Sequence, residues 1–165
     1  MTNDPRHRTR GSWRTLSGTS AGDVIHTVRT LIGEEDWRVH IGTDSRTIAG
    51  RTDFVTVIAA LPPGGGGRIF YRRERHACVY SLAEKLYSEA ELSLQIAQRL
   101  DGEILQDIVV HVDANVDRRY RSSNYVRGLA GMVVGFGFEV HLKPNSWCAS
   151  TVADYLVKDR HVRAA

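Results

Sequence analysis

Apolar and polar residues along the chain follow helical or strand periods, and the pattern breaks at glycine- and proline-rich turns. The segment 20–33 repeats apolar residues at helical spacing and stops at Gly33, which predicts a short amphipathic helix. Strand patterns are expected next over residues 37–45, 52–61 and 68–77. The Pro-Pro-Gly-Gly-Gly-Gly run at 62–67 is the strongest turn signal, so the second and third strands are expected to form a hairpin.

The second half of the chain alternates between helix and strand. Helical patterns cover 79–100, 122–135 and 147–160, and strand patterns cover 108–113 and 138–143. Three consecutive strands with short connections predict an antiparallel meander, whereas strands separated by helices are expected to join the sheet in parallel with right-handed crossovers. The sequence therefore predicts an α/β fold with a mixed five-stranded sheet, three strands antiparallel and then two parallel, flanked by helices.

The 165 residues fit one domain, expected over 19–165 with the first helix leading it. Residues 1–18 are polar and aperiodic, which predicts a disordered basic tail. Residues 1–15 hold four arginines and one aspartate, and the remaining 18 basic and 18 acidic side chains balance, so the net charge of +3 belongs to the tail. Such a tail either binds phosphate weakly or is only a solvated leader.

The apolar content is ordinary for a globular protein, and the longest apolar stretch, Val55–Leu61, is too short to span a bilayer. The N-terminal segment has no apolar core of the kind a secretory signal needs. Cys78 and Cys148 are too few for a disulfide framework. We therefore expect a cytoplasmic protein with no membrane partner, and the oligomeric state stays open.

Two aspartates stand at the ends of apolar strand patterns. Asp44 lies at the end of the strand pattern that begins at Trp37, and Asp113 ends the run Ile-Val-Val-His-Val-Asp. A charge on a central strand is costly unless it is paired or bound to a metal, and open α/β sheets place their sites at the carboxyl ends of strands. The alternative for Asp44 is a turn aspartate just beyond the strand.

Two further acids lie within helical patterns. Glu89 falls on the apolar face of its helix, a face shared with Leu82, Leu86, Ser93, Ile96, Ala97 and Leu100. It is either a ligand, or a glutamate at the edge of this face or in a buried salt bridge to an arginine. Asp154 lies four residues before Lys158 in the last helix, so an ordinary surface ion pair is the competing interpretation.

The four acids would converge if the two aspartate-bearing strands were neighbours. Carboxylates brought together repel one another, and hard cations such as Mg²⁺ or Mn²⁺ relieve this repulsion because they prefer oxygen ligands. Two ions about 4 Å apart can activate water and stabilise the leaving oxygen in a displacement at phosphorus. This pattern predicts a metal-dependent phosphodiester hydrolase.

Several motifs together resemble the ribonuclease H-like superfamily, and more closely the bacterial YkuK family of predicted RNase H-like nucleases. These motifs are IGTDSR at 41–46, SEAELSLQIAQRL at 88–100, HVDANVD at 111–117, the run over 122–150 and VADYLVK at 152–158. The chain differs at Arg46, where the first-strand motif of the family usually ends in glutamine. His141 and His161 are the candidates for the mobile histidine found in some members.

The resemblance implies a catalytic set of Asp44, Glu89, Asp113 and Asp154 that binds two Mg²⁺ or Mn²⁺ ions. It implies that Asp44 bridges both ions, with Glu89 and Asp113 on one ion and Asp154 on the other. The implied substrate is RNA, an RNA–DNA hybrid or structured DNA, cleaved to a 5′-phosphate and a 3′-hydroxyl.

Other residues are expected to contact substrate or to support the fold. Ser45, Asn115, Lys143 and Lys158 are the candidate substrate-binding residues. The basic side chains Arg68, Arg72, Arg73, Arg75, Arg118, Arg119 and Arg121 either contact phosphates or, on the strand, protect a sheet edge. Two other functions stay open: a non-catalytic nucleic-acid or protein-binding module, and a carboxylate-rich phosphatase or nucleotide hydrolase.

Overall fold

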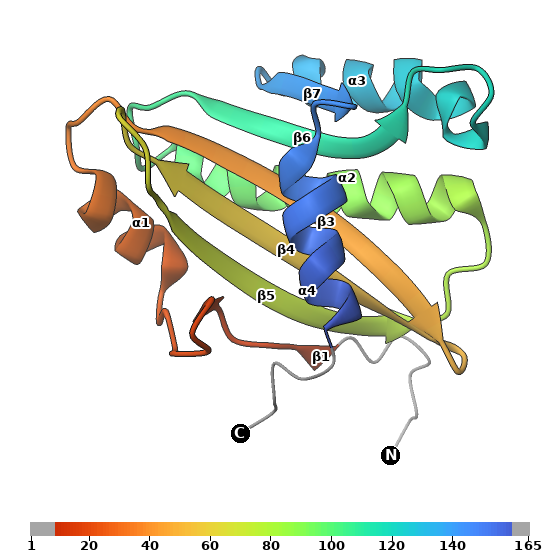
Figure 1. Ribbon diagram of the computed structural model, residues 1–165, viewed down its shortest axis with the longest axis horizontal. Helices are drawn as coiled ribbons and strands as arrows, with labels where there is room; N and C mark the ends of the chain where they lie inside the picture. The colour runs from red at the N-terminus through yellow and green to blue at the C-terminus, as the bar shows by residue number, and fades with distance from the viewer. Residues whose placement is uncertain (1–8, 160–165) are drawn as a thin grey trace.

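The computed structural model describes residues 9–159, and five long strands form its central mixed sheet. The strands are β3 (Arg38–Ile48), β4 (Arg51–Leu61), β5 (Arg68–Ala77), β6 (Ile108–Asn115) and β7 (Glu139–Lys143). They lie in the order β5-β4-β3-β6-β7 (Figure 1). Strands β3, β4 and β5 pair antiparallel, and β6 and β7 add in parallel, which confirms the predicted α/β class and strand directions.

Residues 9–15, which precede the predicted domain, add two short strands to the sheet at the edge of β5. Two short strands, β1 (Thr9–Arg10) and β2 (Arg14–Thr15), pair antiparallel with β5. Trp13 between them is only 6% exposed and lies under the Arg72 guanidinium. The disorder predicted for 1–18 therefore does not extend to residues 9–18, because two-residue strands are too short to show a period. Residues 1–8 lie outside the described part of the chain.

Helices cover both faces of the sheet (Figure 1). On one face, α1 (Val24–Ile32), α2 (Leu82–Asp101) and α3 (Val126–Gly135) enclose the larger hydrophobic core. On the other face, the π-helical segment η2 (Cys148–Ala153) and α4 (Asp154–Lys158) pack on β4 and β5 through a second, smaller core. The central strands are thus buried on both sides, as their nearly continuous apolar runs predict.

The helices are shorter than their sequence patterns because capping side chains and changes of helix type set their ends. Asp23 accepts hydrogen bonds from the backbone of Ile25 and His26, and Ser81 accepts one from Glu84, so α1 and α2 begin just after these caps. The predicted helix 122–135 divides into a 3₁₀ turn, η1 (Arg121–Tyr125), and α3. The predicted helix 147–160 divides into η2 and α4, and residue 160 lies outside the described range.

A glycine lets the C-terminal segment lie directly on the sheet. A Cβ atom built on Gly42 of β3 would lie 2.6 Å from the backbone nitrogen of Ala149 and 2.8 Å from the carbonyl carbon of Cys148. Only glycine permits this approach of two backbones. At the other end of the segment, the Arg73 guanidinium of β5 donates to the Leu156 carbonyl oxygen at 2.7 Å. Together these contacts hold α4 beside the carboxyl end of β3.

Within residues 9–159, no helix combines the length and the apolar character needed to cross a membrane.

Candidate functional site

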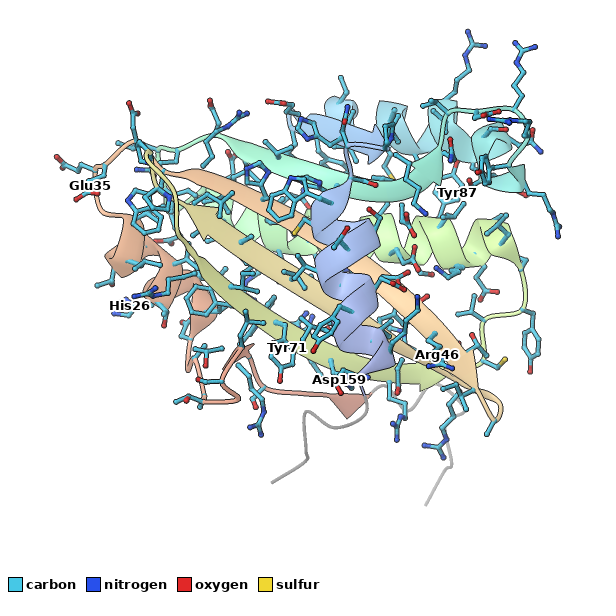
Figure 2. All side chains as sticks on the ribbon, in the orientation of Figure 1. His26, Glu35, Arg46, Tyr71, Tyr87 and Asp159 are labelled. Carbon is cyan, nitrogen blue, oxygen red and sulfur yellow. The ribbon has the colours of Figure 1, made fainter. Side chains whose placement is uncertain are left out.

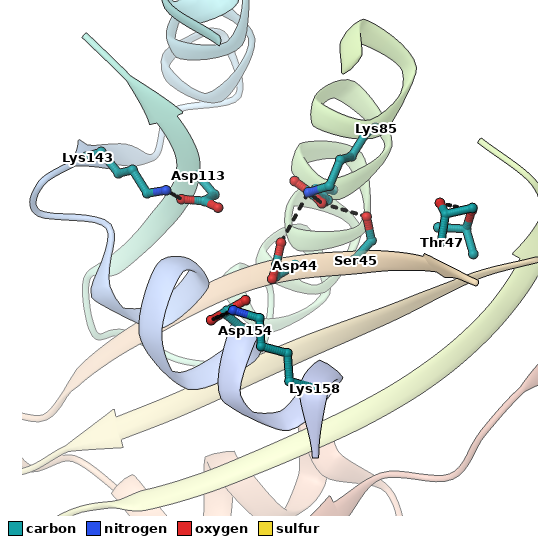
Figure 3. A network of polar contacts seen from close by, with 10 residues as sticks. Asp44, Ser45, Thr47, Lys85, Asp113, Lys143, Asp154 and Lys158 are labelled. Carbon is teal, nitrogen blue, oxygen red and sulfur yellow. Dashed lines mark hydrogen bonds and ion pairs between the residues drawn. The ribbon is translucent and has the colours of Figure 1, made fainter. Parts of the chain in front are cut away.

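Asp44 and Asp113 occupy equivalent places on neighbouring parallel strands. The hydrogen-bonded pairing of β3 with β6 ends at Gly42 and His111, and each aspartate lies two residues further along its strand. Beyond this point the two strands separate, so neither carboxylate is covered by a neighbouring strand on that side (Figure 3). The carboxylates are close enough for the charge of Asp113 to raise the pKa of Asp44.

Glu89 reaches the same region from α2. Its side chain is 3% exposed, and its Oε1 atom accepts a hydrogen bond of 2.7 Å from the Ser45 hydroxyl. Its Oε2 atom is buried without a hydrogen-bond partner. Ser45 neighbours Asp44 on β3, so this hydrogen bond fixes the helix glutamate beside the strand aspartate.

A lysine joins these two carboxylates. Lys85 lies one turn before Glu89 on α2, and its ammonium forms ion pairs with Glu89 Oε1 and with Asp44 Oδ1, the latter at 3.2 Å. Burial alone would lower the pKa of Lys85, but the charges of Glu89 and Asp44 outweigh it and hold that pKa above its usual value. Lys85 is therefore a fixed positive charge inside the acidic group.

Burial controls the protonation of the two carboxylic acids that Lys85 contacts. It raises the pKa of Glu89 to about 7, against the opposing charge of Lys85 and with added repulsion from Asp44. It also raises the pKa of Asp44, which Lys85 and the backbone amide of Ser45 oppose. Neighbouring carboxylates that resist ionisation in this way are typical of sites that bind cations.

Asp113 and Asp154 carry lysine partners of their own. Lys143 on β7 lies 2.7 Å from Asp113 Oδ1, and Lys158 lies 2.7 Å from Asp154 Oδ2 within α4. The i,i+4 ion pair weighed as the ordinary interpretation of Asp154 is thus present. Figure 3 shows the carboxylates of Asp44, Asp113 and Asp154 around one region between β3, β6 and α4. The predicted acids come from both faces of the sheet, Glu89 from α2 and Asp154 from α4, with Asp44 and Asp113 on the strands between them, and each is paired with a lysine.

Among the described residues, no three Asp, Glu, His or Cys side chains are arranged closely enough to form a ready metal cage. The donors that do gather are carboxylate oxygens, which suit hard divalent cations rather than zinc or copper. The lysine ammoniums form ion pairs with the same carboxylate oxygens that such a cation would bind.

The remaining predicted substrate contacts take part in local structure. Ser45 is buried and bonded to Glu89. Asn115 accepts a hydrogen bond from the backbone of Asp117 through its side chain, an Asx turn that ends β6. Asp117 in turn pairs with Arg119.

Exposed arginines flank the acidic region. Arg46 lies at the carboxyl end of β3, near the β3–β4 hairpin (Figure 2), and Arg118 and Arg121 follow β6. Of the strand arginines, Arg72 is buried against Glu74 and Arg73 holds α4, so both support the fold. The exposed arginines thus lie in β3 itself and in the segment that follows β6, the two strands that carry the aspartates.

Three histidines, His40 on β3, His111 on β6 and His141 on β7, lie side by side on neighbouring strands. His40 and His111 are buried and joined by a hydrogen bond of 2.9 Å, and the His141 ring lies 5.0 Å from that of His111. Trp147 packs on His40 and His111. Burial lowers the pKa of His40 to about 4 and of His111 to about 3, so both are neutral at pH 7. His161, the other mobile-histidine candidate, lies outside the described residues.

Lys85 is not among the predicted site residues. A signal for it was present, because Lys85 precedes Glu89 by four residues and therefore shares its helix face. Glu89 does form a buried salt bridge, but its partner is a lysine of its own helix and not the arginine that the alternative interpretation predicted.

The fold and the acidic region together define a protein class. The family model described as Ribonuclease H-like matches residues 23–158, and the chain belongs to this family. The resemblance to YkuK is also confirmed: the chain is 22% identical over 156 residues to the uncharacterized protein YkuK of Bacillus subtilis (strain 168), covering 82% of this chain and 90% of that protein. No solved structure shows significant similarity to the chain.

Proposed function

We propose that the protein is a nuclease that hydrolyses phosphodiester bonds in RNA, an RNA–DNA hybrid or structured DNA with the help of Mg²⁺ or Mn²⁺. The observation that carries this proposal is the gathering of Asp44, Glu89 and Asp113 where two parallel strands of a Ribonuclease H-like fold separate. The carboxyl ends of such strands are where open α/β sheets bind ligands.

The residues fit a hard divalent cation. Every available donor is a carboxylate oxygen, and the buried Glu89 Oε2 atom has no partner among the described residues. A buried polar atom without a partner costs free energy that a ligand can recover. The lysine paired with each carboxylate further supports a cation site, because it shows that these oxygens already bind a positively charged group.

The proposed roles follow from where each side chain lies. Asp44, Asp113, Asp154 and the unpartnered Oε2 atom of Glu89 would hold the cation, which when bound supplies Lewis-acid activation of water and of the phosphate. Glu89 adds negative charge beside Asp44. The hydroxyl of Ser45 donates a hydrogen bond to Glu89 and so keeps the Glu89 carboxylate turned toward Asp44. Lys143 and Lys158, once released from their aspartates, would be free to contact phosphate oxygens. The arginines that flank the acids attract the nucleic-acid backbone.

A cleavage screen tests this function. The substrates are single-stranded RNA, an RNA–DNA hybrid, duplex DNA and branched DNA, each with Mn²⁺, and wild type is compared with Asp44→Asn and Glu89→Gln. We expect wild type to cleave at least one polymer and both variants to lose at least a hundredfold in rate. Equal rates in wild type and Asp44→Asn would refute the assignment.

Glu91→Gln is the matched control for Glu89→Gln. Glu91 is exposed on α2 two residues from Glu89, and its side chain accepts a long hydrogen bond from Gln95. The same chemical change at this place is expected to leave cleavage unchanged. Circular dichroism of all the variants separates loss of chemistry from loss of fold.

The lysine pairing also favours a second candidate, a non-catalytic nucleic-acid-binding module, because ammonium groups already neutralise the acids. This candidate predicts nucleic-acid binding that does not depend on Mn²⁺ and no cleavage of any substrate. Release of phosphate from nucleotides without strand cleavage would instead indicate a phosphatase or nucleotide hydrolase.

A further inference from the structure

The three lysines of the acidic region differ in how firmly they are held. Lys85 contacts two carboxylates, Asp44 and Glu89, whose side chains are 7% and 3% exposed. Lys143 and Lys158 each contact a single carboxylate. Their own side chains are 38% and 62% exposed, compared with 31% for Lys85.

This difference decides which lysines a metal ion can displace. If Lys143 or Lys158 leaves, its ammonium passes into water and the ion takes over its one aspartate. If Lys85 leaves, two buried carboxylates lose their countercharge together, and removing one partner of a buried ion pair is strongly unfavourable. A divalent ion would have to compensate for both while it was itself being dehydrated.

The position of Lys85 also coincides with a role that the family resemblance gives to an ion. Two ions are implied, with Asp44 bridging them and Glu89 on one of the two. The Lys85 ammonium already bridges Asp44 to Glu89. Glu89 Oε1 is further occupied by the Ser45 hydroxyl, which leaves one oxygen of this carboxylate without a partner.

We propose that Lys85 takes the place of one of the two metal ions, so that the site binds a single divalent cation beside a permanent lysine ammonium. The single ion is held by Asp44, Asp113, Asp154 and the free Oε2 atom of Glu89, and it displaces Lys143 and Lys158 but not Lys85. Lys85 is then a positioning residue that keeps Asp44 and Glu89 together whether or not the ion is present. This inference rests on the proposed function, since it concerns the same site.

Chemical footprinting of the wild-type protein tests which lysines move. Reductive methylation followed by mass spectrometry measures the reactivity of each lysine with and without saturating Mn²⁺. We expect the reactivity of Lys143 and Lys158 to rise severalfold with Mn²⁺ and that of Lys85 to stay within twofold of its metal-free value. A rise at Lys85 equal to that at the other two would overturn the inference.

Counting bound ions gives a second, independent readout. The free Mn²⁺ signal in electron paramagnetic resonance is followed during titration of wild type, Lys85→Met and Lys158→Met. We expect one ion per chain in wild type and in Lys158→Met, and two in Lys85→Met. Two ions in wild type, or one ion in both wild type and Lys85→Met, would contradict the role of Lys85.

The outcomes separate this inference from the proposed function. Two bound ions with an exposed Lys85 would reject the inference and leave the metal-dependent nuclease standing. No Mn²⁺ binding and no cleavage would reject both. If Lys85→Met does not fold, the footprinting decides, because it needs no variant.

Discussion

Lys85 and Glu89 lie one turn apart on α2 and form an ion pair that Asp44 shares, although the Glu89 side chain is only 3% exposed. A buried carboxylate held by one ammonium has an oxygen to spare, and here that atom is Glu89 Oε2. The protonation of Glu89 and the binding of a cation at its free oxygen can each be tested by experiment. How α4 is held on the sheet can be tested separately.

The stability of the protein is expected to depend on the protonation of Glu89. Burial raises its pKa from 4.5 to about 7, so the folded state holds this proton more tightly than the unfolded chain does. The resulting stabilisation is complete below about pH 4.5 and is lost as the pH rises through 7. In urea denaturation without divalent cations, we expect the Glu89 contribution to lower the free energy of unfolding of wild type by up to about 1.4 kcal/mol for each pH unit between about 4.5 and 7. Glu89→Gln should lack this decrease, because glutamine does not titrate.

The buried histidines change the free energy of unfolding with pH in the opposite direction to Glu89. The contribution of Glu89 is therefore obtained by subtracting the curve of Glu89→Gln from that of wild type. Burial lowers the pKa of His40 to about 4 and of His111 to about 3, so their neutral forms stabilise the folded state increasingly as the pH rises from these values to about 6.5, above which the contribution is complete. Both proteins share this contribution, and it cancels when the Glu89→Gln curve is subtracted from that of wild type. A difference that does not change between pH 4.5 and 7.5 would contradict the raised pKa of Glu89.

A side chain at Gly42 is expected to lift the C-terminal segment from the sheet. In Gly42→Ala the new Cβ would meet the backbone of Cys148 and Ala149 at less than 3 Å, and backbone can yield only by moving η2. Overpacking of this kind costs about 1–3 kcal/mol, and we expect a lower melting temperature with weaker Mn²⁺ binding.

Gly131→Ala is the control for this substitution. Gly131 lies in α3 with open space where its Cβ would stand, so alanine there is expected to be neutral or to stabilise the helix by up to about 1 kcal/mol. Equal melting temperatures for the two variants would mean that the contact at Gly42 is unimportant.

Arg73 is expected to matter more than its neighbour on the same strand, Arg75. Arg73 donates to the Leu156 carbonyl at 2.7 Å and so fixes α4, whereas Arg75 is half exposed and pairs with Asp53. Arg73→Met should cost about 1.5–3 kcal/mol in free energy of unfolding, and Arg75→Met less than about 1 kcal/mol. Denaturation curves measure both, and a larger loss in Arg75→Met would refute this account of how α4 is held.

Divalent cations are expected to stabilise the folded protein through the acidic region. At a hundredfold excess over its dissociation constant, a ligand that binds only the folded state adds about 2.7 kcal/mol. We expect Mn²⁺ to raise the melting temperature of wild type and to have little effect on Asp113→Asn. Asp117→Asn is the control, because Asp117 is paired with Arg119 in the loop after β6, and it should keep the full response. An equal response in Asp113→Asn would place the ion elsewhere.

The sequence by itself determined the class of fold, because each long strand and helix has a period that is visible in a single chain. The hydrophobic runs of β4 and β6 and the glycine-rich turn at 62–67 are local signals, whereas the capping residues Asp23 and Ser81 were recognised only in the structure. The same reasoning found Glu89, since a charge on an apolar helix face stands out against its neighbours.

Tertiary structure decided what surrounds these residues. The end of β3–β6 pairing at Gly42 and His111, the approach of Ala149 to Gly42 and the bridge from Lys85 to Asp44 join segments far apart in the chain. No period or motif encodes such distances, because they depend on how whole elements pack. That packing determines whether a carboxylate forms an ion pair with a lysine. The ion pairs in turn set the local charge that a cation or a phosphate would encounter.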